Sequence, residues 1–534
     1  MRALLSVYDK SGVVGLAQGL AALGCELVAS GNTAAALRDA GLDVTEVADI
    51  TGFPAILGHR VVTLHPKIHG GVLADRTDPA HRADLEAHGI EPFDLVVSNL
   101  YPFGTDVESF RYGATRPDEL IDIGGPALIR AAAKNHAQVA VVVDPADYEP
   151  VLEELRSEGA LSDATRRRLA RRAFARTAAY DAAVARWFDE PGGSDEVGES
   201  REGDLPESVH LAYGREPLAL RYGENPHQRA ALYRSEGAAG VDGGSGPPWW
   251  AVMTQHGGLA LSYLNLYDAD AAWLLVHDLA AAFGRPAAAI IKHANPCGAA
   301  VAPILADAYQ RAFEGDERSA FGGIVALSEA VDTPTVERMV AAAQADVVIA
   351  PAYAPGTIEA LQAKRRNTRI LEAPAPTPDR WHLRPISGGL LVQDPHTFVA
   401  GRADWRVVTQ RRPTEDEWAD AQLAWRVCGW VRSNAIVLAK DGAAWGIGAG
   451  QQNRVEAGEL AAAKAAGRAK GGACASDAFY PFPDGIEAAA AAGVAVVIQP
   501  GRPGGGAARD EEIIARADEL GLAMIFTGER HFLH

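Results

Sequence analysis

Up to residue 145, short apolar runs alternate with helical patterns, and this alternation limits the fold more than any other feature of the sequence. The runs RALLSV (2–7), CELVAS (25–30), FDLVVSNL (93–100) and QVAVVVD (138–144) have the length and composition of buried strands. Strands that alternate with helices form a parallel sheet covered on both faces. Right-handed crossovers would place these strands in one sheet, with a site at their carboxyl ends. We therefore expect a doubly wound α/β domain.

The domain organisation follows from what comes next along the chain. A helical pattern at 163–188 is followed by DEPGGSDEVGESREGDLPES (189–208), which has eight acidic residues and one arginine and is typical of a linker. A second α/β region begins near residue 209 and is interrupted by the Pro-rich EAPAPTPDRWHLRP (372–385). We expect one domain at 1–188, a linker at 189–208, and a C-terminal part at 209–534 made of two subdomains that meet near 372–385.

Composition and charge exclude several classes of protein. At 534 residues the chain exceeds what one ordinary core supports, and its 48% hydrophobic and 22% charged content is typical of a globular protein. The net charge of −19 argues against nucleic acid as a partner, because duplex binding needs a basic surface. The one basic run, RRRLARR (166–172), lies in a helical pattern and is interpreted as a solvated helix face.

The cellular compartment is indicated by three further features. No window reaches the ~18 consecutive apolar residues that a membrane span needs. The N-terminal MRALLSVYDK enters a strand pattern directly, without the apolar region of a signal peptide. The cysteines Cys25, Cys297, Cys428 and Cys474 lie far apart with no C-x-x-C spacing, as reduced thiols do. We expect a cytoplasmic protein with no membrane partner.

Two stretches of the first domain are candidates for a phosphate site. ASGNTAAAL (29–37) ends a strand and opens a helix, where backbone N–H groups favour an anion, although Ser and Asn there are also ordinary helix caps. IDIGGPALIRAAAKNHA (121–137) has two glycines that let a ligand approach the backbone, with Asp122 just before the helix and Lys134 further along it. The polar GHRVVTLHPKIHGG (58–71) is a third stretch of the kind that lines sites.

The stretch IIKHANPCGAA (290–300) is the main candidate in the C-terminal part. A zinc deaminase needs H-x-E and P-C-x-x-C, and this chain offers one thiol, so the metal interpretation fails. Cys297 as a nucleophile would need a base to deprotonate it. His293 as a general acid or base beside Lys292 suits proton transfer near neutral pH. A structural histidine at a strand end is the remaining alternative.

These stretches together resemble one family, the bifunctional purine biosynthesis enzymes that join AICAR transformylase to IMP cyclohydrolase. In the first domain the resemblance lies in SVYDKSG, LVASGNT, TGFPAILGHRVVTLHPKIHGGVLA, NLYPF and IDIGGPALIRAAAKNHA. In the C-terminal part it lies in LRYGENPHQ, LSYLNLYDADAAW, KHANPCG, SAFGGIVAL, RSNAIV, GIGAGQQNR, SDAFYPF and FTGERHFLH. The motifs follow in one order over nearly the whole chain.

The resemblance implies a fold and two reactions. The first domain would be methylglyoxal-synthase-like and close formyl-AICAR to inosine monophosphate (IMP), releasing water. The C-terminal part would be two cytidine-deaminase-like subdomains that transfer a formyl group from 10-formyltetrahydrofolate to AICAR without a catalytic metal. Family members are homodimers with the transformylase site at the subunit interface, so we expect a homodimer.

The resemblance also implies residue roles. For the transformylase, His293 would be the base and Lys292 would stabilise the transition state. For the cyclohydrolase, Lys134 would be catalytic, assisted by Tyr101 and Asp122. The residues expected to bind substrates are Asp9, Lys10, Ser30, Gly31, Asn32, Thr33, Arg60, Thr63, Ser98 and Asn99 in the first domain, and Arg221, Tyr222, Gly322, Asp346, Asn434, Arg454, Phe479, Asp484 and Arg530 in the C-terminal part.

Departures from the family pattern lie mainly in the cyclohydrolase motifs. Tyr8 and Asn32 replace a serine and a glycine, and Val62 replaces a lysine that contributes to the site. Loss of one cation there would cost on the order of 10–1000-fold in rate, unless Lys67 or Arg60 compensates. The alternative to a fully bifunctional enzyme is therefore an active transformylase with an impaired cyclohydrolase. A nucleotide-binding regulator with dead sites would lack the acid–base groups that are present here.

Overall fold

The computed structural model describes residues 1–58, 60–100, 103, 118, 121–189, 205–235, 247–377, 381–501 and 509–534. It divides into two compact units, Met1–Gly214 with Arg234–Val241, and Arg215–Tyr233 with Asp242–His534. Most of the expected acidic linker, residues 190–204, lies outside the described residues. No helix in the described ranges is both long enough and apolar enough to cross a membrane.

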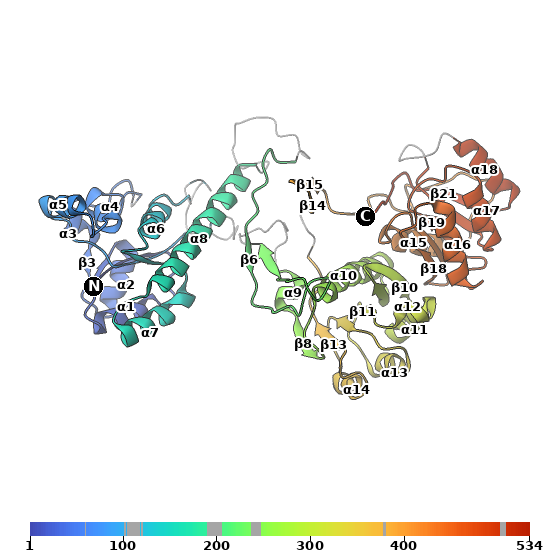
Figure 1. Ribbon diagram of the computed structural model, residues 1–534. Coiled ribbons are helices and arrows are strands. Elements are labelled where there is room, and N and C mark those ends of the chain that lie inside the picture. The colour runs from blue at the N-terminus through green and yellow to red at the C-terminus, as the bar shows by residue number, and fades with distance from the viewer. Residues whose placement is uncertain are drawn as a thin grey trace. The chain divides into compact units, whose positions relative to one another are not determined.

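The first unit contains a five-stranded parallel sheet in the order β3-β2-β1-β4-β5. Figure 1 shows this unit at the N-terminal end of the chain, in blue to teal. All four strands expected from the sequence are confirmed, and one short strand is added at the edge. The strands of this sheet are β1 (Arg2–Val7), β2 (Glu26–Ala29), β3 (Thr45–Glu46), β4 (Leu95–Asn99) and β5 (Ala140–Val142).

Helices cover both faces of this sheet, as the alternation of apolar runs predicts. One apolar cluster joins α1, α2 and α7 to the sheet, and a second joins α4, α6 and α8 to its other face. The doubly wound fold is confirmed. The helices are α1 (Val13–Ala22), α2 (Gly31–Asp39), α3 (Val47–Thr51), α4 (Pro66–Leu73), α5 (Pro79–Ala87), α6 (Gly124–Lys134), the 3-10 turn η3 (Pro145–Asp147), α7 (Tyr148–Glu158) and α8 (Asp163–Asp189).

The basic run 166–172 lies in α8, but its face is not purely solvated. Arg168 and Arg172 both form ion pairs with Asp147, whose side chain is only 4% exposed. A buried carboxylate needs such partners because an isolated charge is costly to bury. Part of this basic face therefore holds α8 against the start of α7.

The second unit contains a twelve-stranded mixed sheet in the order β16-β21-β20-β19-β17-β18-β10-β9-β11-β12-β13-β8. Its strands are β8 (Thr254–Gly257), β9 (Ala287–Lys292), β10 (Asn295–Val301), β11 (Ile324–Leu327), β12 (Val347–Ala350), β13 (Arg369–Glu372), β16 (Arg406–Val407), β17 (Ile436–Lys440), β18 (Ala443–Gly448), β19 (Ala473–Ser476), β20 (Val496–Gln499) and β21 (Ala523–Phe526). Outside this sheet lie β6 (Tyr213–Arg215), β7 (Tyr233–Ser235), and the hairpin of β14 (His382–Ile386) and β15 (Gly389–Gln393).

The two halves of this sheet repeat one topology. In each half a hairpin (β9–β10 or β17–β18) is followed by three parallel strands (β11–β13 or β19–β21), with an antiparallel strand at the edge. The two hairpins pair with each other through β10 and β18, where Ala300 lies opposite Ala443. The C-terminal region is thus built from two like halves, which the sequence itself did not reveal as a repeat.

The helices of the second unit also repeat, with α10 and α15 on one face. A single apolar cluster below α10 and α15 includes residues of both halves, while separate clusters lie under the helices of the other face. These helices are α9 (Trp249–Val252), α10 (Tyr263–Phe283), α11 (Leu305–Gly315), α12 (Glu317–Ala320), α13 (Thr333–Ala341), α14 (Thr357–Lys364), α15 (Glu415–Gly429), α16 (Arg454–Ala465), α17 (Asp484–Ala491) and α18 (Asp510–Glu519).

The close packing of α11 on β10 gives a test of this architecture. A Cβ on Gly298 would lie 1.8 Å from the carbonyl oxygen of Ala312. We expect Gly298→Ala to lower the free energy of unfolding by about 1–3 kcal/mol, because neither backbone can move away cheaply. Gly458→Ala in α16 is the matched control, since its Cβ would meet only a methyl group at 3.9 Å. That change should be neutral or stabilising by about 0.5–1 kcal/mol.

Urea unfolding followed by tryptophan fluorescence can measure both variants, because every tryptophan except Trp187 lies in this unit. Equal midpoints for the two variants would contradict the close approach of α11 to β10.

Candidate active sites

The first candidate site lies at the carboxyl ends of β1, β2 and β4, as a doubly wound sheet predicts. The sheet order reverses between β1 and β4, which is the position where such sheets bind ligands. Asn99 joins the two strand ends: its Oδ1 accepts the N–H groups of Tyr8 (2.6 Å) and Asp9 (3.0 Å), and its Nδ2 donates to the Asp9 carbonyl. Ser98 beside it is buried and its Oγ has no partner among the described residues.

The start of α2 forms the second wall of this site. Ser30 caps the helix and Gly31 has a left-handed backbone (φ 52°), so the family's glycine is not required at Asn32, which lies within the helix. Thr33 is buried, and its hydroxyl both donates to the Val7 carbonyl and accepts the Val7 N–H. That hydroxyl therefore holds α2 to β1, while Gly31 and Asn32 are exposed to a ligand.

The start of α6 forms a third wall. Asp122 Oδ1 accepts the Gly125 N–H at 2.9 Å, and the Asp122 N–H donates to the Tyr180 hydroxyl at 2.7 Å. A Cβ on Gly125 would lie 2.3 Å from Asp122 Oδ2, so only glycine fits there. Burial raises the pKa of Tyr180 to about 12, which keeps its hydroxyl protonated. Thr63 is buried close to Gly124 at the same helix end.

Two of the residues expected to act in ring closure lie at opposite ends of one helix. Asp122 precedes the first turn of α6, and Lys134 is its last residue. The ten steps from Gly124 to Lys134 correspond to about 15 Å along the axis. The shared role of Asp122 and Lys134 in one site stays a prediction. Tyr101 lies outside the described residues.

The departures from the family pattern have identifiable surroundings. Val62 is partly buried against the apolar cluster of α4, α6 and α8. Lys67 donates one hydrogen bond from its Nζ to the Ile50 carbonyl at 2.9 Å. Lys10 Nζ lies 3.3 Å from the Tyr8 carbonyl, and Arg60 is exposed. Hydrogen bonds from Ser11 lower the pKa of Asp9, which is ionised at neutral pH.

The second candidate site lies along one edge of the twelve-stranded sheet, where edge means the line formed by the ends of its strands. The hairpin β9–β10 turns there at His293 and Ala294, and β11, β12 and β13 begin there. Because β18 runs antiparallel to β10, the start of β17 and the ends of β19 and β21 reach the same edge. Asn295 Oδ1 accepts the Arg432 N–H at 3.0 Å, which links the turn to the second half.

The turn that carries His293 has an unusual backbone. His293 and Ala294 have φ values of 57° and 54°, as a two-residue type I′ hairpin turn requires. Most residues other than glycine avoid this region, at a cost of roughly 1–2 kcal/mol each, and asparagine, aspartate and histidine tolerate it better than alanine does. Such strain is found mainly where function requires it. The His293 side chain is exposed, so a substrate can reach its imidazole.

The neighbouring Cys297 does not have the properties of a nucleophile. It is 7% exposed, and its thiol donates to the Ile290 carbonyl. Burial raises its pKa to about 12, so it is not a thiolate near neutral pH. In the part of the chain that the structure describes, no three His, Cys, Asp or Glu side chains gather as a metal ion would require.

Lys292 lies among the other residues expected in the first half. Its Nζ donates to the Phe321 carbonyl, and a Cβ on Gly322 would lie 3.2 Å from Nζ and 3.9 Å from Asp346 Oδ1. Arg221 stacks on the ring of Tyr222, with Cζ 5.4 Å from the ring centre. The Arg221 N–H donates to the Leu261 carbonyl, which places this pair at the same edge.

Arg369 was not expected from the sequence. It opens β13 and donates to the Ala260 carbonyl through Nε and Nη2. Burial lowers its pKa, and the charges of Asp346 and Arg221 act on it. It thus adds a cation behind Asp346 and Arg221.

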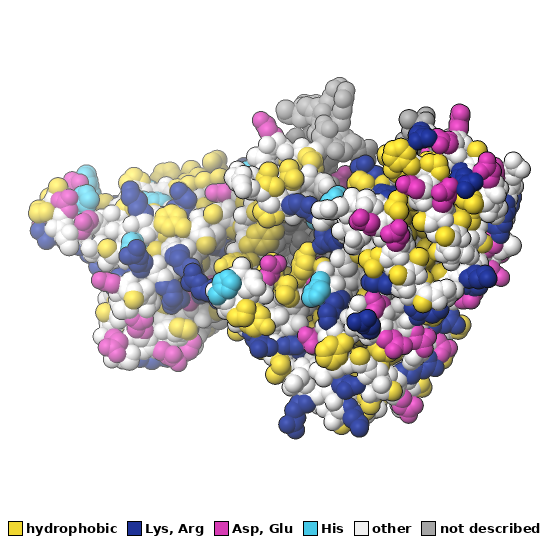
Figure 2. Space-filling model, turned by 45° about the vertical axis from the view of Figure 1, so that its right-hand side comes forward, with side chains coloured by type: hydrophobic (Ala, Val, Ile, Leu, Met, Phe, Trp, Pro, Cys, Tyr) yellow, Lys and Arg dark blue, Asp and Glu magenta, His cyan; other side chains and the backbone are white. Residues whose placement is uncertain are grey.

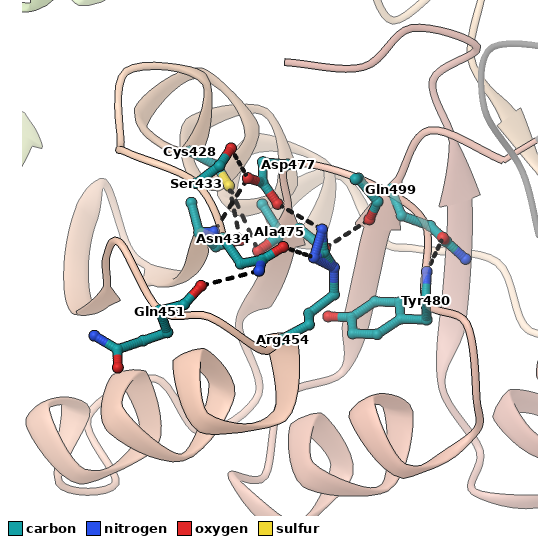
Figure 3. Close-up of polar contacts among 12 residues, drawn as sticks. Cys428, Ser433, Asn434, Gln451, Arg454, Ala475, Asp477, Tyr480 and Gln499 are labelled. Carbon is teal, nitrogen blue, oxygen red and sulfur yellow. Dashed lines mark hydrogen bonds and ion pairs between the residues drawn. The ribbon is translucent and has the colours of Figure 1, made fainter. Parts of the chain in front are cut away.

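In the second half, Arg454 and Asn434 belong to a buried polar network (Figure 3). The Arg454 guanidinium donates to Asn434 Oδ1 (2.8 Å) and Asp477 Oδ1 (3.0 Å), and its side chain is 8% exposed. Asp477 Oδ2 also accepts the Ser433 hydroxyl and the Ala435 N–H. One hydrogen bond from each terminal nitrogen of Arg454 thus fixes Asn434 and Asp477, while its Nε has no partner among the described residues. The expected role of Arg454 in substrate binding stays a prediction.

The remaining expected residues lie around this network. Phe479 is partly buried against the cluster of α16–α18, and Asp484 Oδ1 accepts the Gly485 N–H at the start of α17. Arg530 is exposed and stacks on Phe532, with Cζ 4.5 Å from the ring centre. The His531 N–H donates to the Asp477 carbonyl, so the C-terminal tail is tied to the network.

Three residues close to the sites were missed by sequence reasoning: Asp268, Arg369 and Asp477. Asp268 and Asp477 lie inside motifs that matched the family, LSYLNLYDADAAW and SDAFYPF, and that match was the only signal for them. Arg369 has no such signal, because nothing in RRNTRI (365–370) distinguishes one arginine from the others.

A doubly wound unit with polar groups at its strand ends, followed by a duplicated α/β unit with an exposed histidine next to a lysine, has the organisation of a two-site enzyme. The family model described as "AICARFT/IMPCHase bienzyme" matches residues 132–464, and the "MGS-like domain" model matches residues 12–127. The chain therefore belongs to the AICARFT/IMPCHase bienzyme family, as the resemblance of its motifs indicated. The methylglyoxal-synthase-like character of the first unit is confirmed.

Curated relatives agree with this assignment over the full length. The bifunctional purine biosynthesis protein PurH of Dinoroseobacter shibae is 50% identical, that of Ruegeria pomeroyi 49% and that of Anoxybacillus flavithermus 46%. Each match covers 100% of this chain and 98–99% of the relative. Among solved structures, a crystal structure of ForH aligns with 35% of this chain at 39% identity and a TM-score of 0.33.

The tail that carries Arg530 gives a prediction on pH. His531 Nε2 lies 3.1 Å from Glu529 Oε1, and His396 Nε2 lies 2.8 Å from His531 Nδ1. In this chain of contacts His531 Nε2 donates to Glu529 and His396 Nε2 donates to His531 Nδ1, which leaves His396 Nδ1 unprotonated. A second proton on that buried nitrogen would have no hydrogen-bond acceptor among the described residues. Burial, with the charges of His531 and Arg426, lowers the pKa of His396 to about 4.

Between pH 6.5 and 4, His396 therefore binds a proton in the unfolded chain but not in the folded unit. We expect the free energy of unfolding to decrease as the pH is lowered through this window, by up to about 1.4 kcal/mol per pH unit from His396. His396→Phe should reduce this slope, whatever its effect at pH 7. Urea titrations at pH 7 and pH 5 measure it, and an unchanged slope in the variant would refute the prediction.

Proposed function

We propose that this bifunctional enzyme of purine biosynthesis uses its second unit to transfer a formyl group from 10-formyltetrahydrofolate to AICAR. Its first unit then closes formyl-AICAR to inosine monophosphate, with release of water. Family membership and full-length relatives support the pair of activities. The single observation that carries the assignment of the transfer step is the exposed His293, next to Lys292, on a left-handed turn at the sheet edge.

The formyl transfer requires two proton movements. The AICAR amine is a poor nucleophile, so His293 removes its proton as the nitrogen attacks the formyl carbon. The folate nitrogen must be protonated as it leaves. Lys292, whose ammonium lies beside Gly322, stabilises the negative charge that develops on the formyl oxygen.

The substrates would be held along the same sheet edge. Arg221 is exposed and can present its guanidinium to phosphate, which a planar bidentate donor suits. Arg454 also fixes Asn434 and Asp477 through one hydrogen bond to each. The residues proposed for nucleotide and folate contacts are Arg221, Tyr222, Gly322, Asp346, Asn434, Arg454, Phe479, Asp484 and Arg530.

For ring closure, the proposed nucleotide site lies at the carboxyl ends of the first sheet. The exposed backbone at Gly31 and Asn32 suits a phosphate at a helix N-terminus. Asp122 at the start of α6 and Lys134 at its end are proposed to act at different points, since the helix separates them. The other proposed contacts are Asp9, Lys10, Ser30, Thr33, Arg60, Thr63, Ser98, Asn99 and Tyr101.

We also propose that the enzyme is a homodimer in the cytoplasm. Large hydrophobic side chains are exposed in and after the β14–β15 hairpin, with Ile386 51%, Leu391 54% and Val399 86% exposed, and Figure 2 shows hydrophobic side chains among charged ones on the visible surface. Exposed apolar patches of this kind mark interfaces, and a second copy is the proposed occupant. All four cysteines are free, as expected for a reducing compartment.

The test of the two-step function is one reaction of the purified protein with AICAR and 10-formyltetrahydrofolate. Tetrahydrofolate, formyl-AICAR and inosine monophosphate are followed together. Tetrahydrofolate and inosine monophosphate should rise in step. Tetrahydrofolate with accumulating formyl-AICAR would instead indicate a weak cyclohydrolase, and no tetrahydrofolate would overturn the transfer step.

Substitutions in the two units should separate the two activities. His293→Ala should lower formyl transfer by about 10²–10⁴-fold, because the general base is lost. Its cyclisation of supplied formyl-AICAR should be unchanged, since that site lies in the other unit. Lys134→Ala should show the reverse pattern. Formyl transfer that persists in His293→Ala would exclude this residue as the base.

Val62→Lys tests whether the missing lysine limits ring closure. Val62 packs against an apolar cluster, so the change should cost about 1 kcal/mol of stability in the first unit, even if the lysine reaches solvent. We expect the rate of cyclisation to stay within about threefold, less than 1 kcal/mol in the barrier. A rise of about tenfold or more would identify the natural chain as an impaired cyclohydrolase.

A further inference from the structure

A carboxylate on α10 lies beneath the turn that carries His293. Asp268 Oδ1 accepts the Ala294 N–H at 2.9 Å. The backbone of His293 also lowers the pKa of this carboxyl group, so it lies close to both residues of the turn. Asp268 is only partly exposed. A side chain from a different element therefore holds this two-residue turn through the Ala294 N–H.

The second half of the unit contains the same arrangement. The β17–β18 hairpin turns at Asp441 and Gly442, which also have positive φ values of 51° and 81°. The backbone of both residues lowers the pKa of Asp420 on α15, so this carboxyl group lies close to the turn. A helix carboxylate thus lies against the hairpin turn in each half.

The two carboxylates occupy equivalent positions. Asp268 is the sixth residue of α10 and Asp420 the sixth residue of α15, and each helix begins with a capping box. A lysine precedes each turn, Lys292 in one half and Lys440 in the other. The repeated topology therefore includes the helix cap, the carboxylate and the hairpin that it holds.

The difference between the halves lies in the turn residues. Asp-Gly is a preferred sequence for a type I′ turn, whereas His-Ala is not, because both residues must adopt a left-handed backbone without glycine. The Asp441–Gly442 turn lies at the opposite edge of the sheet from His293 and near none of the proposed site residues. The Asp441–Gly442 turn therefore favours its conformation by its own sequence, whereas the His293–Ala294 turn has no glycine that would do so.

We propose that Asp268 is a positioning residue of the formyl transfer, which holds the His293–Ala294 turn in its left-handed conformation and so aims the imidazole at the substrate. This inference rests on the proposed role of His293. The fold supplied a structural clamp in both halves, and in the first half the clamped turn carries a functional side chain. Asp268 itself need not touch the substrate.

The experiment compares Asp268→Ala with Asp268→Asn, in the full chain, by kcat and KM for formyl transfer. Removal of the acceptor should lower kcat by about 10–100-fold with little change in KM, because a displacement of about 1 Å at the base has that effect. The asparagine retains an oxygen acceptor at the same place, so it should restore kcat to within about tenfold of the natural enzyme.

Two further variants separate positioning from a general structural role. Asp420→Ala removes the equivalent clamp from a turn with no catalytic residue, and it should change stability but leave kcat within about threefold. Ala294→Gly gives the turn the residue that Gly442 supplies in the other half. In combination with Asp268→Ala it should recover kcat at least about fivefold, because glycine adopts the left-handed backbone without the clamp.

The outcomes distinguish this inference from the proposed function. If natural enzyme transfers formyl and His293→Ala does not, an unchanged kcat in Asp268→Ala, or equal losses in Asp268→Ala and Asp420→Ala, overturns the positioning role alone. If His293→Ala retains transfer, the proposed function fails first, and with it this inference. Should Asp268→Ala not fold, Asp268→Ser with and without Ala294→Gly replaces it, and absence of recovery by the glycine overturns the role.

Discussion

The pairing of β10 with β18 is the interaction on which the second unit depends. It joins two six-stranded halves of the same topology into one sheet, and it lets a single apolar cluster form beneath α10 and α15. Because β10 and β18 are antiparallel, the β9–β10 turn of the first half lies at the same end of the sheet as the start of β17 and the ends of β19 and β21. Lys292 and His293 therefore share a sheet edge with Asn434 and the C-terminal tail, although more than a hundred residues separate them.

The duplicated halves also show how a structural device can acquire a chemical use. In both, a carboxylate on the helix before the hairpin lies against the turn, and Asp268 accepts the Ala294 N–H. In the second half burial raises the pKa of Asp420 to about 6, although the backbone of the turn acts to lower it. Its turn carries Asp-Gly, which folds readily by itself. In the first half, an exposed histidine lies on the equivalent hairpin turn, beside the equivalent helix carboxylate.

Much of the first unit could be predicted from local patterns. Each expected strand was a short apolar run, and both faces of the sheet are covered because such runs bury side chains on both sides. The site residues at the strand ends follow from the same topology. The separation of Asp122 and Lys134 could not be predicted in this way, because a motif that contains both residues does not give the length of the helix between them. The surroundings of Val62 and Lys67 likewise needed the tertiary structure.

The sequence by itself determined the α/β class, the alternation of strands and helices in the first unit, the family, and the residue types that carry the chemistry. These depend on local periodicity and on motifs. Only the tertiary structure decided which of these residues are free to act. The guanidinium of Arg454 is bound to Asn434 and Asp477, the Cys297 thiol is buried and protonated, and His293 is exposed on a turn held by Asp268. Such facts depend on contacts between distant segments, and local sequence patterns do not encode burial or hydrogen-bond partners across a fold.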